Sequence, residues 1–203
     1  MATWDSADLL ARCKVVAQRP ATDEDMSDAA WYSLLTEAQD YWMKILAQHA
    51  PELLAAAPVA LSTADSGLTY TFATEPLFVI EITAGKGQRA LRAGAYNDPQ
   101  AEFCWEGTSK IRMARDSART FASGLYARQV SLPTDVSSGV QPVIPTMARP
   151  LLVPRAVYYY AVRGGYRDPQ PYLVMEQKLW SGDQTMPGDT GLLGLLKKRQ
   201  SQQ

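Results

Sequence analysis

The chain has 203 residues, of which 46% are hydrophobic, and a formal net charge of −1. This is the composition of a globular protein, so it excludes a chain that is disordered throughout, and the isoelectric point near 5.9 excludes a strongly basic nucleic-acid binder. No stretch approaches the ~20 apolar residues of a membrane-spanning helix. The N-terminus lacks the basic and apolar regions of a signal peptide, so we expect a soluble protein made in the cytoplasm.

Charge is distributed unevenly along the chain. Residues 1–85 hold 4 basic and 12 acidic residues, a net −8, whereas residues 86–128 carry a net +4 and residues 129–203 a net +3. Such asymmetry indicates complementary surfaces, either between copies of the chain or toward a charged partner. A simpler explanation, that helices with acidic first turns dominate the first part, stays open.

Two helices are predicted in the first third of the chain. Apolar residues at helical spacing predict one over 6–18, with Ser6 as its N-cap. A longer one is predicted to begin after Ser27 and to end before Pro51. Its apolar stripe consists of Trp31, Leu34, Leu35, Ala38, Trp42, Ile45, Leu46 and His49. Because the link between the two helices is short, we expect an antiparallel pair.

The middle of the chain changes to the period of β-strands. Strands are predicted over 67–73, 77–83 and 124–132. Residues 74–76 are expected to form the turn between the first two strands, and residues 102–114 a hairpin with its bend at Gly107. The β-rich block is therefore placed at residues 67–132.

Helical periodicity returns in the last third of the chain. A helix is predicted to begin near Pro154, or to bend there, and to stop at Gly164. Another helix is predicted over 169–182. The segment 184–203 then carries a leucine-rich and basic set: Leu192, Leu193, Leu195, Leu196, Lys197, Lys198 and Arg199. Chain ends are usually polar and frayed, so we expect a flexible tail, whose leucines either fold back on the core of the chain or bury on another molecule.

Together these elements predict an α+β fold, in which an antiparallel α-helical bundle has a β-rich insertion and an extended C-terminal tail. The predicted parts are an N-terminal helix pair over 1–66, the insertion over 67–132, the closing helices over 133–183 and the tail over 184–203.

Signatures of catalysis and metal binding are missing from the sequence. His49 is the only histidine, and Cys13 and Cys104 lie far apart, so neither a Cys/His zinc site nor a Ser-His-Asp or Cys-His site can be assembled from a recognisable motif. We expect no cofactor, no metal and no enzymatic activity, and we expect both cysteines to be small buried side chains. An enzyme that uses carboxylates of the β-rich block stays an alternative, with Asp98, Glu102 and Glu106 as its candidates.

A basic stretch in the β-rich block allows two interpretations. Basic residues interleaved with aromatic ones can follow a phosphate backbone, as in a DNA-binding module, or can meet an acidic neighbouring subunit. Three consecutive tyrosines, 158 to 160, cover most of a helix circumference and cannot all enter one core; tyrosine suits wet interfaces. Candidate inter-subunit or lumen contacts are therefore Lys110, Arg112, Arg115, Arg119, Arg128, Tyr158 and Tyr159.

Three stretches resemble, in pattern and order, the head–tail adaptor (connector) proteins of tailed bacteriophages. They are residues 28–74 (DAAWYSLLTEAQDYWM…), 104–133 (CWEGTSKIRMARDSART…) and 150–200 (PLLVPRAVYYYAVRGG…). The sequence departs from the family at Pro150 and Pro154, where such proteins commonly have an uninterrupted helix.

The resemblance implies a structural protein of the virion neck that forms a ring of twelve copies below the portal protein. Double-stranded DNA would pass through the lumen without sequence recognition, and a stopper or tail-completion protein would bind the opposite face. The C-terminal segment from Leu192 to Arg199 would dock on the portal. A tail-completion or stopper role in the same neck is the alternative within this class.

Overall fold

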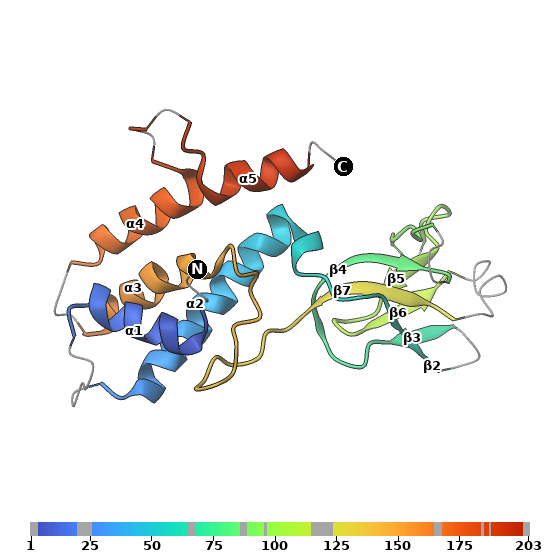
Figure 1. Ribbon diagram of the computed structural model, residues 1–203. Helices are drawn as coiled ribbons and strands as arrows, with labels where there is room; N and C mark the ends of the chain where they lie inside the picture. The colour runs from blue at the N-terminus through green and yellow to red at the C-terminus, as the bar shows by residue number, and fades with distance from the viewer. Residues whose placement is uncertain are drawn as a thin grey trace. The chain divides into compact units, whose positions relative to one another are not determined.

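The computed structural model describes residues 4–19, 26–64, 68–85, 89–95, 97–114, 124–164, 168–183, 185–186 and 188–200. It contains both helices and antiparallel sheets, which confirms the α+β class. The chain divides into two compact units (Figure 1). The helical unit consists of Met1–Ala50 and Pro133–Gln203, and the β unit consists of Pro51–Leu132.

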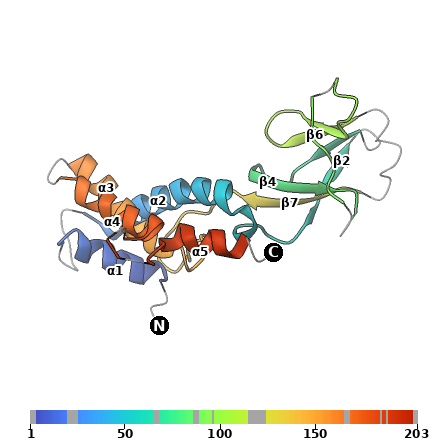
Figure 2. The same cartoon turned by 90° about the horizontal axis from the view of Figure 1, so that it is seen from above.

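Helix α3 is the centre of the helical unit. The helices are α1 (Ser6–Val16), α2 (Asp28–His49), α3 (Leu152–Gly164), α4 (Gln170–Ser181) and α5 (Gly191–Gln200), and a 3-10 turn η3 (Arg149–Leu151) leads into α3. Helix α3 packs against α1, α2 and α4, whereas α5 packs on α4 (Figure 2). Helices α1 and α2 also contact each other, although the main partner of α1 is α3, which the sequence did not predict.

The helix ends follow from their capping residues. Ser27 caps α2 as predicted, since its hydroxyl accepts a hydrogen bond from the Ala30 N–H. Helix α1 is capped by Asp5 rather than Ser6, because the Asp5 carboxylate accepts from the Asp8 N–H at 2.8 Å. Helix α3 begins two residues before Pro154, whose missing N–H is harmless in a first helical turn.

The inner face of α2 is buried along its length. Its buried residues are Trp31, Leu34, Leu35, Ala38, Gln39, Trp42, Met43, Leu46 and Ala47. Of the predicted stripe, Ile45 is only half-buried and His49 is exposed. The ring of Trp31 lies 5.0 Å from that of Tyr160 in α3, so aromatic contacts join the two helices.

The segment 133–148 is fastened to α2 by side-chain amide and hydroxyl groups. The fully buried Gln39 donates to the Thr134 carbonyl at 2.9 Å and accepts from the Val143 N–H at 2.7 Å. The Thr36 hydroxyl accepts from the Val136 N–H at 2.9 Å. These bonds give the backbone of an irregular segment the partners that a helix or sheet would otherwise provide.

The β unit contains two antiparallel sheets that share one core. Its strands are β1 (Val59–Ala60), β2 (Ser62–Ala64), β3 (Thr69–Thr71), β4 (Pro76–Thr83), β5 (Phe103–Trp105), β6 (Lys110–Met113) and β7 (Tyr126–Ser131), preceded by a 3-10 turn η1 (Pro51–Leu53). One sheet has the order β1-β7-β4 and the other β2-β3-β6-β5. Both sheets contribute to the core, which includes Tyr70, Phe72, Ile82, Phe103, Ile111, Met113, Leu125 and Ala127.

The strand predictions are confirmed for the hairpin and corrected elsewhere. Strands β5 and β6 pair around Gly107, which has a φ of 79°. Strands β3 and β4 do not form the expected hairpin, because they belong to different sheets. The β unit also begins earlier than residue 67, since β1 and β2 precede it, with Leu61 as the single residue between them.

Candidate interaction surfaces

The described residues contain no group of three His, Cys, Asp or Glu side chains that could hold a metal ion. His49 lies against the ring of Trp180, with 5.6 Å between the ring centroids. Cys13 is buried, and burial raises the pKa of its thiol, so it is not a nucleophile. Cys104 is half-buried rather than buried, which departs from the prediction.

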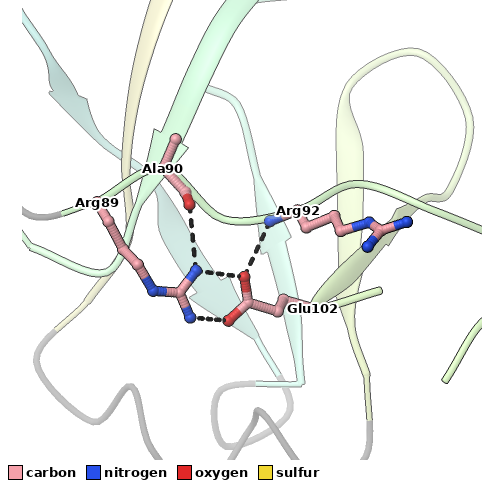
Figure 3. A network of polar contacts seen from close by, with 4 residues as sticks. All are labelled: Arg89, Ala90, Arg92 and Glu102. Atoms are coloured by element: carbon pink, nitrogen blue, oxygen red, sulfur yellow. Dashed lines mark hydrogen bonds and ion pairs between the residues drawn. The ribbon is translucent and has the colours of Figure 1, made fainter. Parts of the chain in front are cut away.

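Of the carboxylates proposed as an alternative catalytic set, Glu102 and Asp98 make structural hydrogen bonds, those of Glu102 being shown in Figure 3. The Glu102 carboxylate accepts hydrogen bonds from two guanidinium nitrogens of Arg89, at 2.8 and 2.5 Å. It also accepts one from the Arg92 backbone N–H at 3.0 Å. The hydrogen bond from Arg89 lowers the pKa of Glu102, whereas a general acid needs a raised one. Asp98 accepts from the Gln100 N–H at 2.9 Å within its own loop.

The three predicted basic residues that the structure describes are divided between the two sheets of the β unit. On β6, Lys110 and Arg112 alternate with the core residues Ile111 and Met113 and so lie on the outward face of their sheet. Arg128 lies on the outward face of the other sheet, opposite Glu81 of β4. Arg115 and Arg119 fall outside the described residues.

The tyrosines 158 and 159 surround an ion pair inside the helical unit. Arg155 of α3 donates to both carboxylate oxygens of Glu176 in α4, at 2.7 and 2.5 Å. The guanidinium carbon lies 3.7 Å from the ring centroid of Tyr41, and 5.3 and 5.7 Å from those of Tyr158 and Tyr159. Both tyrosines are half-buried and lie beside the guanidinium group of Arg155 in their own helix. Their contact with a neighbouring subunit or a lumen stays a prediction.

Glu176 has an unusual place in α4. It is the one buried residue of that helix, and burial raises the pKa of its carboxyl while Arg155 opposes the shift. The buried indole N–H of Trp42 lies near this carboxylate and lowers its pKa slightly. It forms no hydrogen bond with an acceptor among the described residues. This bidentate ion pair fixes the position of α4 on α3. Separating the two helices would leave each buried charge without its partner, which is energetically costly.

The C-terminal segment corrects the prediction of a flexible tail. Residues Gly191–Gln200 form helix α5, in which Leu192 and Leu196 are buried at 6% and 3% exposure. Leu193 is half-buried, whereas Leu195 is 51% exposed. Two leucines therefore find apolar contacts in the chain itself, because positions four apart share one face of a helix.

The remaining members of the predicted docking set lie near the end of α5. Lys197 and Lys198 are exposed. Arg199 belongs to the same helix, but its side chain lies outside the described part. The contact of this set with a portal protein stays a prediction.

The turn between α4 and α5 is held by two aspartates. Asp183 accepts from the Thr185 N–H and hydroxyl, at 3.0 and 2.6 Å, and pairs with Lys178 at 2.9 Å. The hydrogen bonds from Thr185, with that from Lys178, lower the pKa of Asp183 to about 2. Asp189 accepts from the Asp183 N–H at 2.9 Å and from the Gly191 N–H at 3.0 Å, so it joins both ends of the turn.

An apolar groove of about 690 Å³ lies between α1 and α4. Residues of α1 form one wall of the groove, and residues of α4 form the other. The start of α3 forms the floor. Its lining residues are Trp4, Asp8, Ala11, Arg12, Val15, Val16, Pro150, Val153, Pro154, Met175 and Leu179. Val15, Met175 and Leu179 are 74%, 42% and 39% exposed, so water covers apolar side chains that a folded protein usually buries.

Sequence reasoning missed this groove. Ala11 and Val15 lie four residues apart on this face of α1, but Asp8 and Arg12 on the same face are charged, so the face has no continuous apolar stripe. The stronger stripe through Leu9 and Cys13 hid this face.

Comparison with protein-family models and with curated proteins finds no match for the chain. Among the described residues, no helix is long and apolar enough to cross a membrane.

Proposed function

We propose that the protein is a structural component of a phage virion neck, a head–tail adaptor that assembles as a ring of about twelve copies below the portal protein. In this proposal the helical unit is the antiparallel bundle of the adaptor, and the β unit is the insertion in that bundle. The protein has no enzymatic activity and acts through its contacts. The resemblance of three stretches of sequence to this family supports the proposal.

The observation that carries the proposal is the uncovered apolar groove of the helical unit. Val15, Met175 and Leu179 line it and remain in contact with water in the single chain. Burying such side chains stabilises a complex by roughly 1.5–3 kcal/mol each, before the costs of association. Exposed apolar surface of this kind is typical of a surface that binds another molecule, and in this proposal that molecule is a protein of the neck.

Charge supports a conduit that carries DNA without reading its sequence. Three of the described cations of the β unit lie on separate sheets, with Lys110 and Arg112 on one and Arg128 on the other. Glu81 and Glu102 lie near basic side chains and reduce the local positive charge. Weak, dispersed contacts with phosphates allow a duplex to slide, whereas a concentrated basic patch would hold it.

Electron cryo-microscopy of the purified protein mixed with portal-bearing capsids tests the proposal. We expect a ring in direct contact with the portal, coaxial with the DNA channel. A protein that binds only isolated tails would instead be a tail-completion protein. A protein that binds neither capsids nor tails, while it binds short DNA duplexes as a monomer with a steep dependence on salt, would be a DNA-binding module.

A further inference from the structure

We infer that the groove between α1 and α4 receives helix α5 of a neighbouring copy of the same chain, with Leu195 as the inserted side chain. The inference rests on the proposed ring, and it assigns the contact between adjacent subunits. It requires no unfolding of α5, because Leu195 lies outside the surface by which α5 packs on its own chain.

The groove needs an occupant with a long apolar side chain on a helix. Its α1 wall runs from Asp8 to Val16, which at 1.5 Å per residue is about 12 Å, or roughly two helical turns. The opposite wall, formed by Met175 and Leu179, follows one turn of α4. A groove between two helices with an apolar floor is a common acceptor of a third helix.

The helical unit itself offers few side chains of this kind. Its exposed large apolar side chains outside the groove are Val140, Val143, Val162, Val174, Met186 and Leu195. The four valines are short and branched at Cβ, so they reach less far from the backbone. Met186 lies in the turn before α5. Among the exposed side chains that the structure describes in the helical unit outside the groove, Leu195 alone combines a long apolar side chain with a position on a helix.

Helix α5 presents Leu195 in a fixed orientation. Its other face is anchored by the buried Leu192 and Leu196, and its start is held by the hydrogen bond from the Gly191 N–H to Asp189. A surface that is already ordered loses little conformational freedom when it binds, so more of the burial energy appears as affinity. The chain therefore carries an exposed leucine on an anchored helix and, on a different surface, an apolar groove.

The two surfaces are different, and this has a consequence for symmetry. The lining residues of the groove that the structure describes include none from α5. A contact between two different patches is heterologous, and repeated contacts of this kind close into a ring when the rotation between copies allows it. The groove is lined by two charged residues, Asp8 and Arg12, and of these Asp8 is opposite in charge to Lys197 of the neighbouring α5.

Cysteine cross-linking of the full-length chain tests the contact. Leu179→Cys and Leu195→Cys are made separately in a Cys104→Ser background, mixed, and oxidised. We expect a disulfide-linked dimer that contains one chain of each variant. Val174→Cys replaces Leu179→Cys as the matched control, because Val174 is 51% exposed on the same helix but outside the groove. Equal cross-linking of the control would overturn the inference.

Sedimentation of Leu195→Glu gives a second, independent measurement. Because Leu195 is exposed, the variant should keep its circular dichroism spectrum, whereas self-association should weaken about tenfold or more, the effect of losing one buried leucine. A wild-type chain that stays monomeric and forms no cross-link would overturn the inference. Cross-linking of Leu195→Cys to the portal protein instead would overturn it as well.

These outcomes separate the inference from the proposed function. Rings of Leu195→Glu that still sit on the portal would leave the adaptor assignment intact and refute the groove contact. A specific cross-link between copies that bind no portal would refute the adaptor assignment and leave the groove contact intact.

Discussion

Replacing Gln39 measures how much its hydrogen bonds to the segment 133–148 contribute to the free energy of unfolding. Gln39→Met keeps the length of the side chain but removes its bonds to the Thr134 carbonyl and the Val143 N–H. A buried polar group left without a partner costs about 1–3 kcal/mol. Because Val143 is 48% exposed, water can replace part of the second bond, so we expect the free energy of unfolding to fall by about 2 kcal/mol.

Urea unfolding followed by tryptophan fluorescence checks this value. Trp105 is the one tryptophan of the β unit among five in the chain, so a Trp105→Phe background makes the fluorescence report on the helical unit alone. The matched control is Gln48→Met, at an exposed position of the same helix, where a change within about 0.5 kcal/mol is expected. A loss below about 0.5 kcal/mol in Gln39→Met would refute the reasoning, since the two bonds would then contribute no net stability.

Two further predictions concern α4 and the turn after it. Arg155→Met leaves the Glu176 carboxylate buried without its partner, so the free energy of unfolding should fall by about 3–5 kcal/mol; adding Glu176→Leu should recover most of the loss, and a double variant as unstable as the single one would contradict a pairing role. Because the pKa of Asp183 is lowered to about 2, its contribution is present above the ordinary carboxyl range and is lost as the pH falls toward 2. After correction for the pH dependence of the intrinsic exchange rate, the hydrogen-exchange protection of α5 should therefore fall on acidification in the wild type and change less in Asp183→Asn; an equal fall in both would contradict the assignment.

Local signals made part of the fold predictable. Ser27 caps α2 as expected, and Gly107 turns the β5–β6 hairpin, because each position depends on residues only a few places away. Strand β1 has two residues and pairs with β7, at Val59 opposite Ala127. A strand of two residues shows no alternation of polar and apolar residues, so the sequence carries no strand signal there. The strand forms because it pairs with residues almost 70 positions away.

The C-terminal helix shows where composition misled the prediction. Leu192 and Leu196 are four residues apart, which suits a helix face, but their position near the chain end favoured a tail. The overlooked signal is Asp189, whose carboxylate accepts from the Gly191 N–H at the start of α5, as an N-terminal capping residue does.

The division of the chain also sets an order for folding during synthesis. The β unit is one continuous segment, so every partner in its sheets has been made once Leu132 is added. Helices α1 and α2 are made first, yet α3, the helix on which both pack, follows more than 100 residues after the end of α2. The nascent chain therefore keeps the apolar face of α2, with Trp31 at its start, exposed to solvent and chaperones until its last third emerges.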